Sequence, residues 1–141
     1  MTPNEFSERL WEFSVRVAKV VDALPETRMG RHIAGQLCRC GTSSAPNYEE
    51  AAVAESRADF VHKLNVAWKE MRETRGWLRF ISKLALLPDK RMAPLIDESD
   101  QLSRLLSSSI ATAKGKPRPR AAAFAISNPQ SPIPNPQSHL R

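Results

Sequence analysis

Basic side chains at helical spacing are the clearest chemical feature of this 141-residue sequence. Arg72, Arg75 and Arg79 are separated by three and four residues, and this spacing places them along one side of an α-helix. Such a row can contact the phosphates of a nucleic acid, and Trp68 lies one turn away as a stacking surface for a base. The pattern therefore predicts a candidate nucleic-acid-binding surface.

The candidate surface extends to neighbouring positions and to a second predicted helix. Its residues are Arg31, Arg39, Lys69, Arg72, Arg75 and Arg79. The competing interpretation is a solvated helix face, because Glu70 and Glu73 lie in the same segment and can pair with the nearby cations. The sequence leaves both interpretations open.

Cysteine and histidine form no recognisable catalytic or metal-binding motif. Cys38 and Cys40 are two residues apart, which turns their side chains ~200° from each other around a helix, so both are expected to be small buried core thiols. His32 and His62 are single histidines on different predicted helices. Since no phosphate-binding glycine loop or hydrolase motif is present, we expect no enzyme activity, metal, cofactor or small-molecule substrate.

The net charge of +6 is distributed unevenly along the chain. Residues 115–141 contain four basic and no acidic side chains, whereas residues 1–114 contain 17 basic and 15 acidic ones. Bulk charge therefore does not indicate nucleic-acid binding by the folded part. No apolar run approaches the ~18 residues of a membrane span, and the first residues lack a secretory signal, so a cytoplasmic protein without membrane contact is expected.

Apolar residues that recur every three or four positions predict the helices that carry these side chains. The first helix is expected between Pro3 and Pro25, with Thr2 as its cap, and its apolar row is Phe6, Leu10, Phe13, Val17, Val20 and Leu24. The third is expected from Ser56 to a point before Pro88, and its row is Phe60, Leu64, Ala67, Met71, Thr74, Leu78, Ile81 and Ala85.

The other two predicted helices are less regular. The second contains Ile33, Leu37 and Cys40 at helical spacing, and Pro46 predicts a kink or break over residues 44–47. The fourth begins near residue 89 or 94 and ends at residue 113. Short links between the helices predict an all-α, antiparallel up-down-up-down four-helix bundle over residues 1–114.

The last 27 residues have a different composition. Residues 115–141 contain six of the eleven prolines, and the sequence of residues 128–131 recurs at residues 135–138. A segment of this kind buries too little apolar surface to offset its conformational entropy. We therefore expect a disordered, proline-rich tail.

Three motifs give the chain a family resemblance. Residues 36–43 read QLCRCGTS, residues 47–51 read NYEEA, and residues 56–64 read SRADFVHKL. Together they resemble the four helix bundle family that is also called the 23S rRNA intervening sequence protein family. The resemblance covers roughly residues 6–114 and departs from the family pattern at residues 44–46.

The resemblance implies an antiparallel four-helix bundle that assembles into pentameric rings. Some relatives are encoded within insertions in large-subunit rRNA genes, and related accessory proteins of diversity-generating retroelements work with a reverse transcriptase and nucleic acid. No catalytic activity is established for the family. The residues that match its pattern have no agreed functional role, and they are Asn47, Tyr48, Glu50, Arg57, Lys63 and Glu70.

Two functional hypotheses follow. The first is a non-enzymatic homo-oligomer, a pentamer by resemblance, that binds RNA, DNA or a nucleoprotein partner through the candidate residues. The second is a protein-interaction scaffold without nucleic-acid binding, in which the tryptophans at positions 11, 68 and 77 mark subunit or partner contacts.

Overall fold

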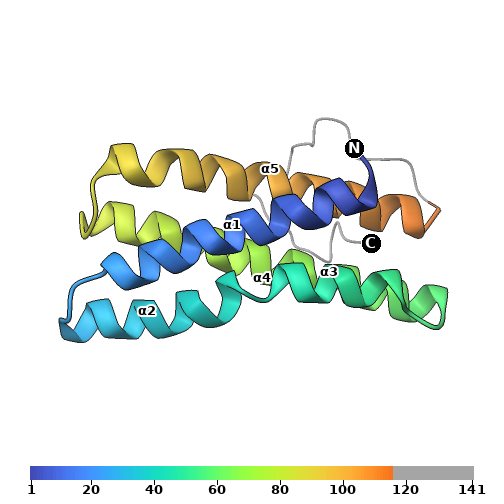
Figure 1. Ribbon diagram of the computed structural model, residues 1–141, viewed down its shortest axis with the longest axis horizontal. Helices are drawn as coiled ribbons and strands as arrows, with labels where there is room; N and C mark the ends of the chain where they lie inside the picture. Colours follow the sequence, from blue (N-terminus) through green and yellow to red (C-terminus); the bar gives the residue numbers. More distant parts are fainter. Residues whose placement is uncertain (116–141) are drawn as a thin grey trace.

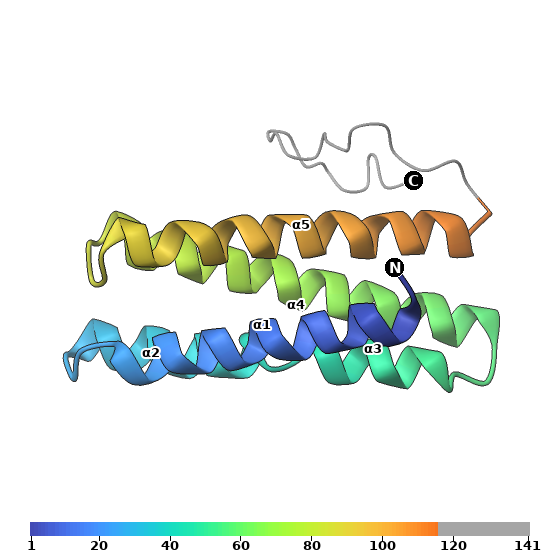
Figure 2. The ribbon, with the colours of Figure 1, turned by 45° about the horizontal axis from the view of Figure 1, so that its top comes forward.

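The computed structural model describes residues 1–115 and consists of α-helices joined by short links. The helices are α1 (Pro3–Ala23), α2 (Arg28–Gly41), α3 (Ser44–Ala52), α4 (Arg57–Lys83) and α5 (Asp89–Ala113). Because α2 and α3 follow each other along one side, the helices form four antiparallel columns (Figures 1 and 2). The predicted all-α four-helix bundle is confirmed, and the predicted tail lies outside the described residues apart from Gly115.

The helix starts follow from local hydrogen bonds that the sequence predicts. The hydroxyl of Thr2 accepts a hydrogen bond from the backbone N–H of Glu5, and the Glu5 carboxylate accepts one from the backbone N–H of Thr2. This reciprocal capping box satisfies backbone donors at the start of α1. The Ser56 hydroxyl caps α4 in the same way by accepting from the backbone N–H of Asp59.

The break in the second column differs from the prediction. It lies at Thr42 and Ser43, between α2 and α3, rather than over residues 44–47. Pro46 falls in the first turn of α3, where the N–H that proline lacks has no partner within the helix anyway, so it is accommodated without a kink. Ser44 fixes the start of α3 against α4, because its hydroxyl donates to the Ala67 carbonyl at 2.8 Å.

The core contains the predicted apolar rows with two exceptions. All six apolar residues of the first row are buried, and so are the members of the third row from Leu64 to Ile81, whereas Phe60 is only partly buried against the core. Ala85 is exposed and has a φ of 57°, because α4 ends at Lys83 and the chain turns towards α5. Leu86 and Leu87 pack against the core instead. None of the helices in residues 1–115 is long and apolar enough to cross a bilayer.

Helices α1 and α2 are in close contact at Gly41. A Cβ atom at this position would lie 2.5 Å from Cγ1 of Val17, so the helix contact requires glycine. The Ser14 hydroxyl donates to the Gly41 carbonyl at 2.9 Å and fixes the same crossing. The small residue thus sets the distance between the first two columns.

Glu49 ties α1 to α3. Its carboxylate accepts hydrogen bonds from the Trp11 indole at 2.9 Å and from the Ser7 hydroxyl at 2.7 Å. These two hydrogen bonds, that from Trp11 first, lower the pKa of Glu49, because they stabilise the charged form. These two hydrogen bonds, which we call the Glu49 clamp, are therefore strongest when Glu49 is ionised.

We expect Gly41→Ala to lower the free energy of unfolding by about 1–3 kcal/mol, because the added methyl group overpacks the contact with Val17. Urea unfolding followed by circular dichroism measures the change. Gly35→Ala is the matched control, since nothing lies within 4 Å of its Cβ position and alanine raises helix stability by about 0.5–1 kcal/mol. A Gly41→Ala protein as stable as Gly35→Ala would contradict the close contact.

A second prediction concerns the pH dependence of the Glu49 clamp. Since the pKa of Glu49 is lower in the folded than in the unfolded chain, the stability that it contributes is present at neutral pH and is lost as the pH falls through the depressed pKa. The indole N–H NMR signal of Trp11 should titrate with a midpoint below the ordinary glutamate value of 4.5. The Glu49→Gln variant should lack this titration. A midpoint at or above 4.5 would show that the hydrogen bonds do not form in solution.

Candidate nucleic-acid interface

The outer side of α4 carries exposed basic residues. Lys69, Arg72 and Arg79 are exposed, and within residues 1–115 none of them forms an ion pair with an acidic side chain. These three of the six candidate residues thus lie exposed on α4, and we call them the α4 row.

Arg72 has the most constrained position in the α4 row. Its guanidinium lies over the Trp68 ring, 5.5 Å from the ring centroid, in a cation–π contact. Partial burial, and then the like charge of Arg75, lower the pKa of Arg72, whereas Asp100 raises it. Arginine still stays protonated at neutral pH. Trp68 is partly buried against the core and carries this guanidinium over its ring, and its stacking with a base stays a prediction.

Two of the predicted residues serve mainly to connect helices. Arg39 of α2 pairs with Glu70 at 3.3 Å and also with Glu73, both on α4. Nε of Arg75 lies 3.8 Å from the Asp100 carboxylate of α5 and has no hydrogen-bond partner among the residues that the structure describes. Much of the charge of these arginines is neutralised within the bundle. The competing interpretation, in which Glu70 and Glu73 pair with neighbouring cations, holds for Arg39.

Arg31 belongs to α2 and not to the α4 row. It is exposed in the first turns of α2, and its guanidinium donates to the Glu26 carbonyl at 2.8 Å. The bundle thus divides the six predicted residues into the α4 row, two arginines in ion pairs between helices, and one arginine at the start of α2.

An aromatic cluster that the sequence analysis missed lies between α2 and α4. The rings of His32 and Trp77 are 5.8 Å apart, those of Trp77 and Phe80 are 5.9 Å apart, and both pairs meet edge to face. His32 is exposed, while Trp77 and Phe80 are partly buried against the core. The cluster joins residues that are 45 positions apart in the sequence, so no local spacing signals it.

The remaining polar groups do not assemble a reactive centre in the described part of the chain. Cys38 is exposed because α2 turns this residue outwards, so the prediction of a buried thiol is wrong for Cys38. Cys40 is buried as predicted, and burial raises the pKa of its thiol. Among residues 1–115, no three histidine, cysteine, aspartate or glutamate side chains are grouped closely enough to hold a metal ion.

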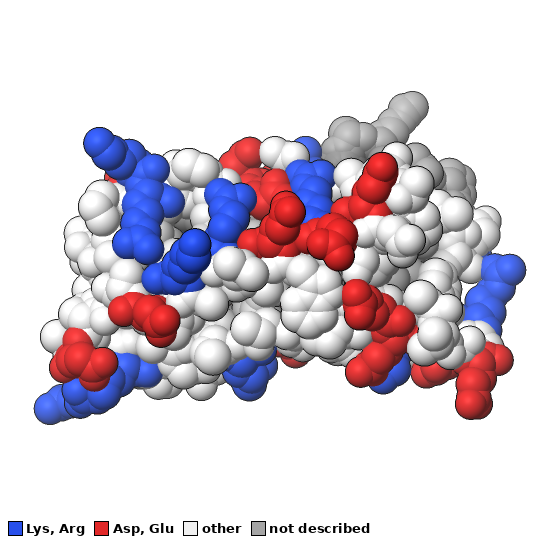
Figure 3. Space-filling view, in the orientation of Figure 1, with Lys and Arg blue, Asp and Glu red and all other residues white. Residues whose placement is uncertain are grey.

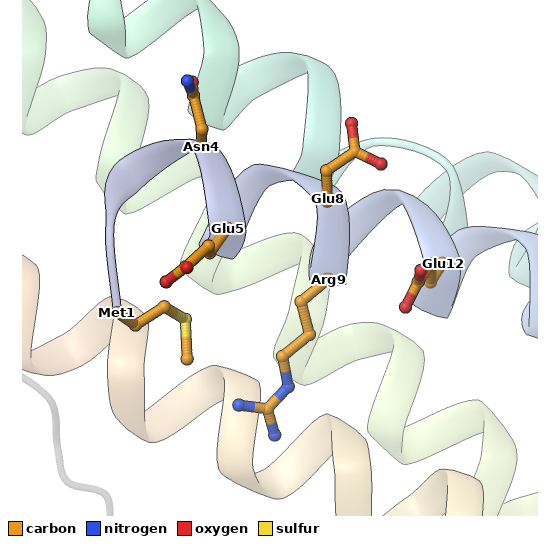
Figure 4. Close-up of a pocket in the computed structure, with 6 residues that line it drawn as sticks. All are labelled: Met1, Asn4, Glu5, Glu8, Arg9 and Glu12. Atoms are coloured by element: carbon orange, nitrogen blue, oxygen red, sulfur yellow. The ribbon is translucent and has the colours of Figure 1, made fainter.

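An open hollow lies along the N-terminal half of α1 and is lined by three glutamates and three other residues (Figure 4). Its lining consists of Met1, Asn4, Glu5, Glu8, Arg9 and Glu12. Arg9 extends towards α5, where its guanidinium forms a bidentate pair with the Glu98 carboxylate at 2.7 and 2.8 Å. Glu8 points to the opposite side of α1, away from α5. The paired Arg9 connects α1 to α5.

Comparisons with known proteins identify the family. The family model described as 23S rRNA-intervening sequence protein matches residues 4–108. A solved structure of a protein of unknown function from the S23 ribosomal protein family of Bacteroides thetaiotaomicron is 33% identical, with a TM-score of 0.72, and the alignment covers 78% of this chain and 98% of that chain. No curated protein matches. Neither description names a reaction. Sequence and fold together show that this chain belongs to the 23S rRNA-intervening sequence protein family.

Proposed function

We propose that this protein is a non-enzymatic, homo-oligomeric helical bundle that binds nucleic acid or a nucleoprotein partner. The observation that carries the proposal is the α4 row, whose three cations are exposed and form no ion pair within residues 1–115. The description of the family, which refers to 23S rRNA, supports the same function.

The physical basis is the release of counterions from phosphates. Each phosphate that a lysine or arginine neutralises releases condensed cations, so affinity falls as salt rises. Three cations on one protomer provide a weak interaction. Repetition of the α4 row in a symmetric oligomer would present several rows to one nucleic acid and raise the effective affinity.

An exposed apolar pair on α1 supports the oligomer. Trp11 is 38% exposed and Val15 is 55% exposed, one helical turn apart. Trp68 and Trp77, the other two tryptophans, are partly buried against the core. Trp11 is therefore the tryptophan best placed for a contact with a second copy of the chain. Of the three tryptophans on which the scaffold hypothesis rests, Trp11 is also the exposed one.

Binding is tested with the full-length protein and labelled RNA and DNA by fluorescence anisotropy over a salt series. The triple variant Lys69→Gln/Arg72→Gln/Arg79→Gln should lose at least ~10-fold in affinity and show a salt slope smaller by about two to three. The control is Arg57→Gln/Lys63→Gln/Lys114→Gln, which removes the same charge elsewhere. If the wild-type protein binds neither nucleic acid at low salt, nucleic-acid binding is excluded and the scaffold function remains. Binding without a salt slope would contradict the phosphate contacts of the α4 row.

The oligomer is tested by size-exclusion chromatography with light scattering. The wild-type mass should be a multiple of 15.8 kDa, and Val15→Glu should lower it by placing a charge in the contact. Val53→Glu is the control, because Val53 is 79% exposed in the link between α3 and α4. A monomeric wild-type protein would remove both the oligomer and the gain from repeated α4 rows.

A further inference from the structure

Charge is separated along the length of the bundle. The links between α1 and α2 and between α4 and α5 lie at the same end (Figure 1). Residues 16–32 and 79–91, which surround these links and which we call the basic end, contain eight basic and three acidic side chains. The other described residues contain nine basic and twelve acidic ones. A nearly neutral bundle therefore carries a charge of +5 at one end.

Four helices contribute two cations each to the basic end. They are Arg16 and Lys19 of α1, Arg28 and Arg31 of α2, Arg79 and Lys83 of α4, and Lys90 and Arg91 of α5. The Arg91 guanidinium donates to the Lys19 carbonyl at 3.4 Å, which brings α5 next to α1. Figure 3 shows basic side chains gathered over these adjoining parts of α1 and α5.

These cations form no ion pair with the acidic side chains in the described part of the chain. Every ion pair found within residues 1–115 lies outside the basic end. The acidic residues there are Asp22, Glu26 and Asp89, and Asp89 accepts a hydrogen bond from the Ser82 hydroxyl. Arg28 and Lys90 also lie in the first turns of α2 and α5, where the helix dipole disfavours a cation. An external anion would relieve this repulsion.

The aromatic cluster is adjacent in the sequence to two of these cations. Its members His32 and Phe80 directly follow Arg31 and Arg79 in the sequence, and Trp77 lies between the two rings. Basic residues that follow a phosphate backbone, next to partly exposed aromatic rings, form the usual combination for binding single strands, because an unpaired base exposes its face for stacking. A duplex buries those faces.

From this arrangement we infer that the basic end binds a single-stranded segment of nucleic acid. Its phosphates contact the cations of the four helices, and an unpaired base contacts the His32–Trp77–Phe80 cluster. The inference rests on the proposed nucleic-acid binding and names the ligand and the place: the strand continues from the α4 row, at Arg79, onto the end of the bundle.

The phosphate contacts are tested with a labelled single-stranded oligonucleotide, and the full-length protein is titrated at several salt concentrations. The variant Lys19→Gln/Arg28→Gln/Arg91→Gln should bind at least ~10-fold more weakly, with a salt slope smaller by about two to three. The control Arg57→Gln/Lys63→Gln/Lys114→Gln, with the same loss of charge, should stay within about threefold of the wild type. If the wild-type protein binds and the basic-end variant binds equally well, this inference fails and the proposed function stands. If the wild-type protein does not bind the oligonucleotide, the basic-end inference and the proposed nucleic-acid binding both fail.

The stacking contact has its own readout. The oligonucleotide should quench tryptophan fluorescence, and the quench should be largely lost in Trp77→Phe but kept in Trp68→Phe. The duplex of the same sequence should bind at least ~10-fold more weakly. Equal binding of the duplex, or a full quench in Trp77→Phe, would overturn the single-strand assignment.

A lipid surface is the competing partner, because Met29 and Leu84 are exposed apolar residues at the same end. Vesicles of phosphatidylglycerol and phosphatidylcholine are therefore tested in parallel by co-sedimentation. Binding to these vesicles without binding to the oligonucleotide would replace the nucleic acid with an anionic membrane. Binding to the oligonucleotide alone would support the inference.

Discussion

Burial of one apolar row from each column is the constraint on which the rest of the structure depends. The row of α1 from Phe6 to Leu24 and the row of α4 from Leu64 to Ile81 can be removed from water only by packing against other helices. Four antiparallel columns joined by short links satisfy this requirement. The packing also fixes which side of every helix faces outwards, and so determines which charged residues remain in contact with water.

The same packing divides the basic residues into two groups. Where acidic residues of a neighbouring helix lie within reach, the cations form ties between columns, as Arg9 does with Glu98 and Arg39 does with Glu70. The exposed pairs of Arg39 add little stability individually, whereas the Arg9–Glu98 pair is partly buried. By contrast, the cations of the α4 row and of the basic end form no ion pair with an acidic side chain of residues 1–115. Whether a basic residue leaves positive charge on the surface thus depends on whether a neighbouring helix places an acidic side chain within reach of it.

The sequence predicted the helices more accurately than their surfaces. Periodicity gave the buried rows, and Thr2 and Ser56 gave the helix starts, because capping and amphipathicity depend on residues a few positions apart. It misplaced the break near Pro46, since proline fits either at a kink or in the first turn of a new helix. It also assigned a buried thiol to Cys38, which the orientation of α2 exposes.

The amino-acid sequence by itself determined that the chain folds into amphipathic helices, where most of them begin and end, and that their apolar rows form an antiparallel bundle. All of this follows from interactions within one or two helical turns. Only the tertiary structure decided which cations are neutralised, which aromatic rings meet, and that the excess positive charge lies at one end. Those properties depend on contacts between residues far apart in the chain, such as His32 with Trp77 and Arg91 with Lys19, and no local spacing encodes them.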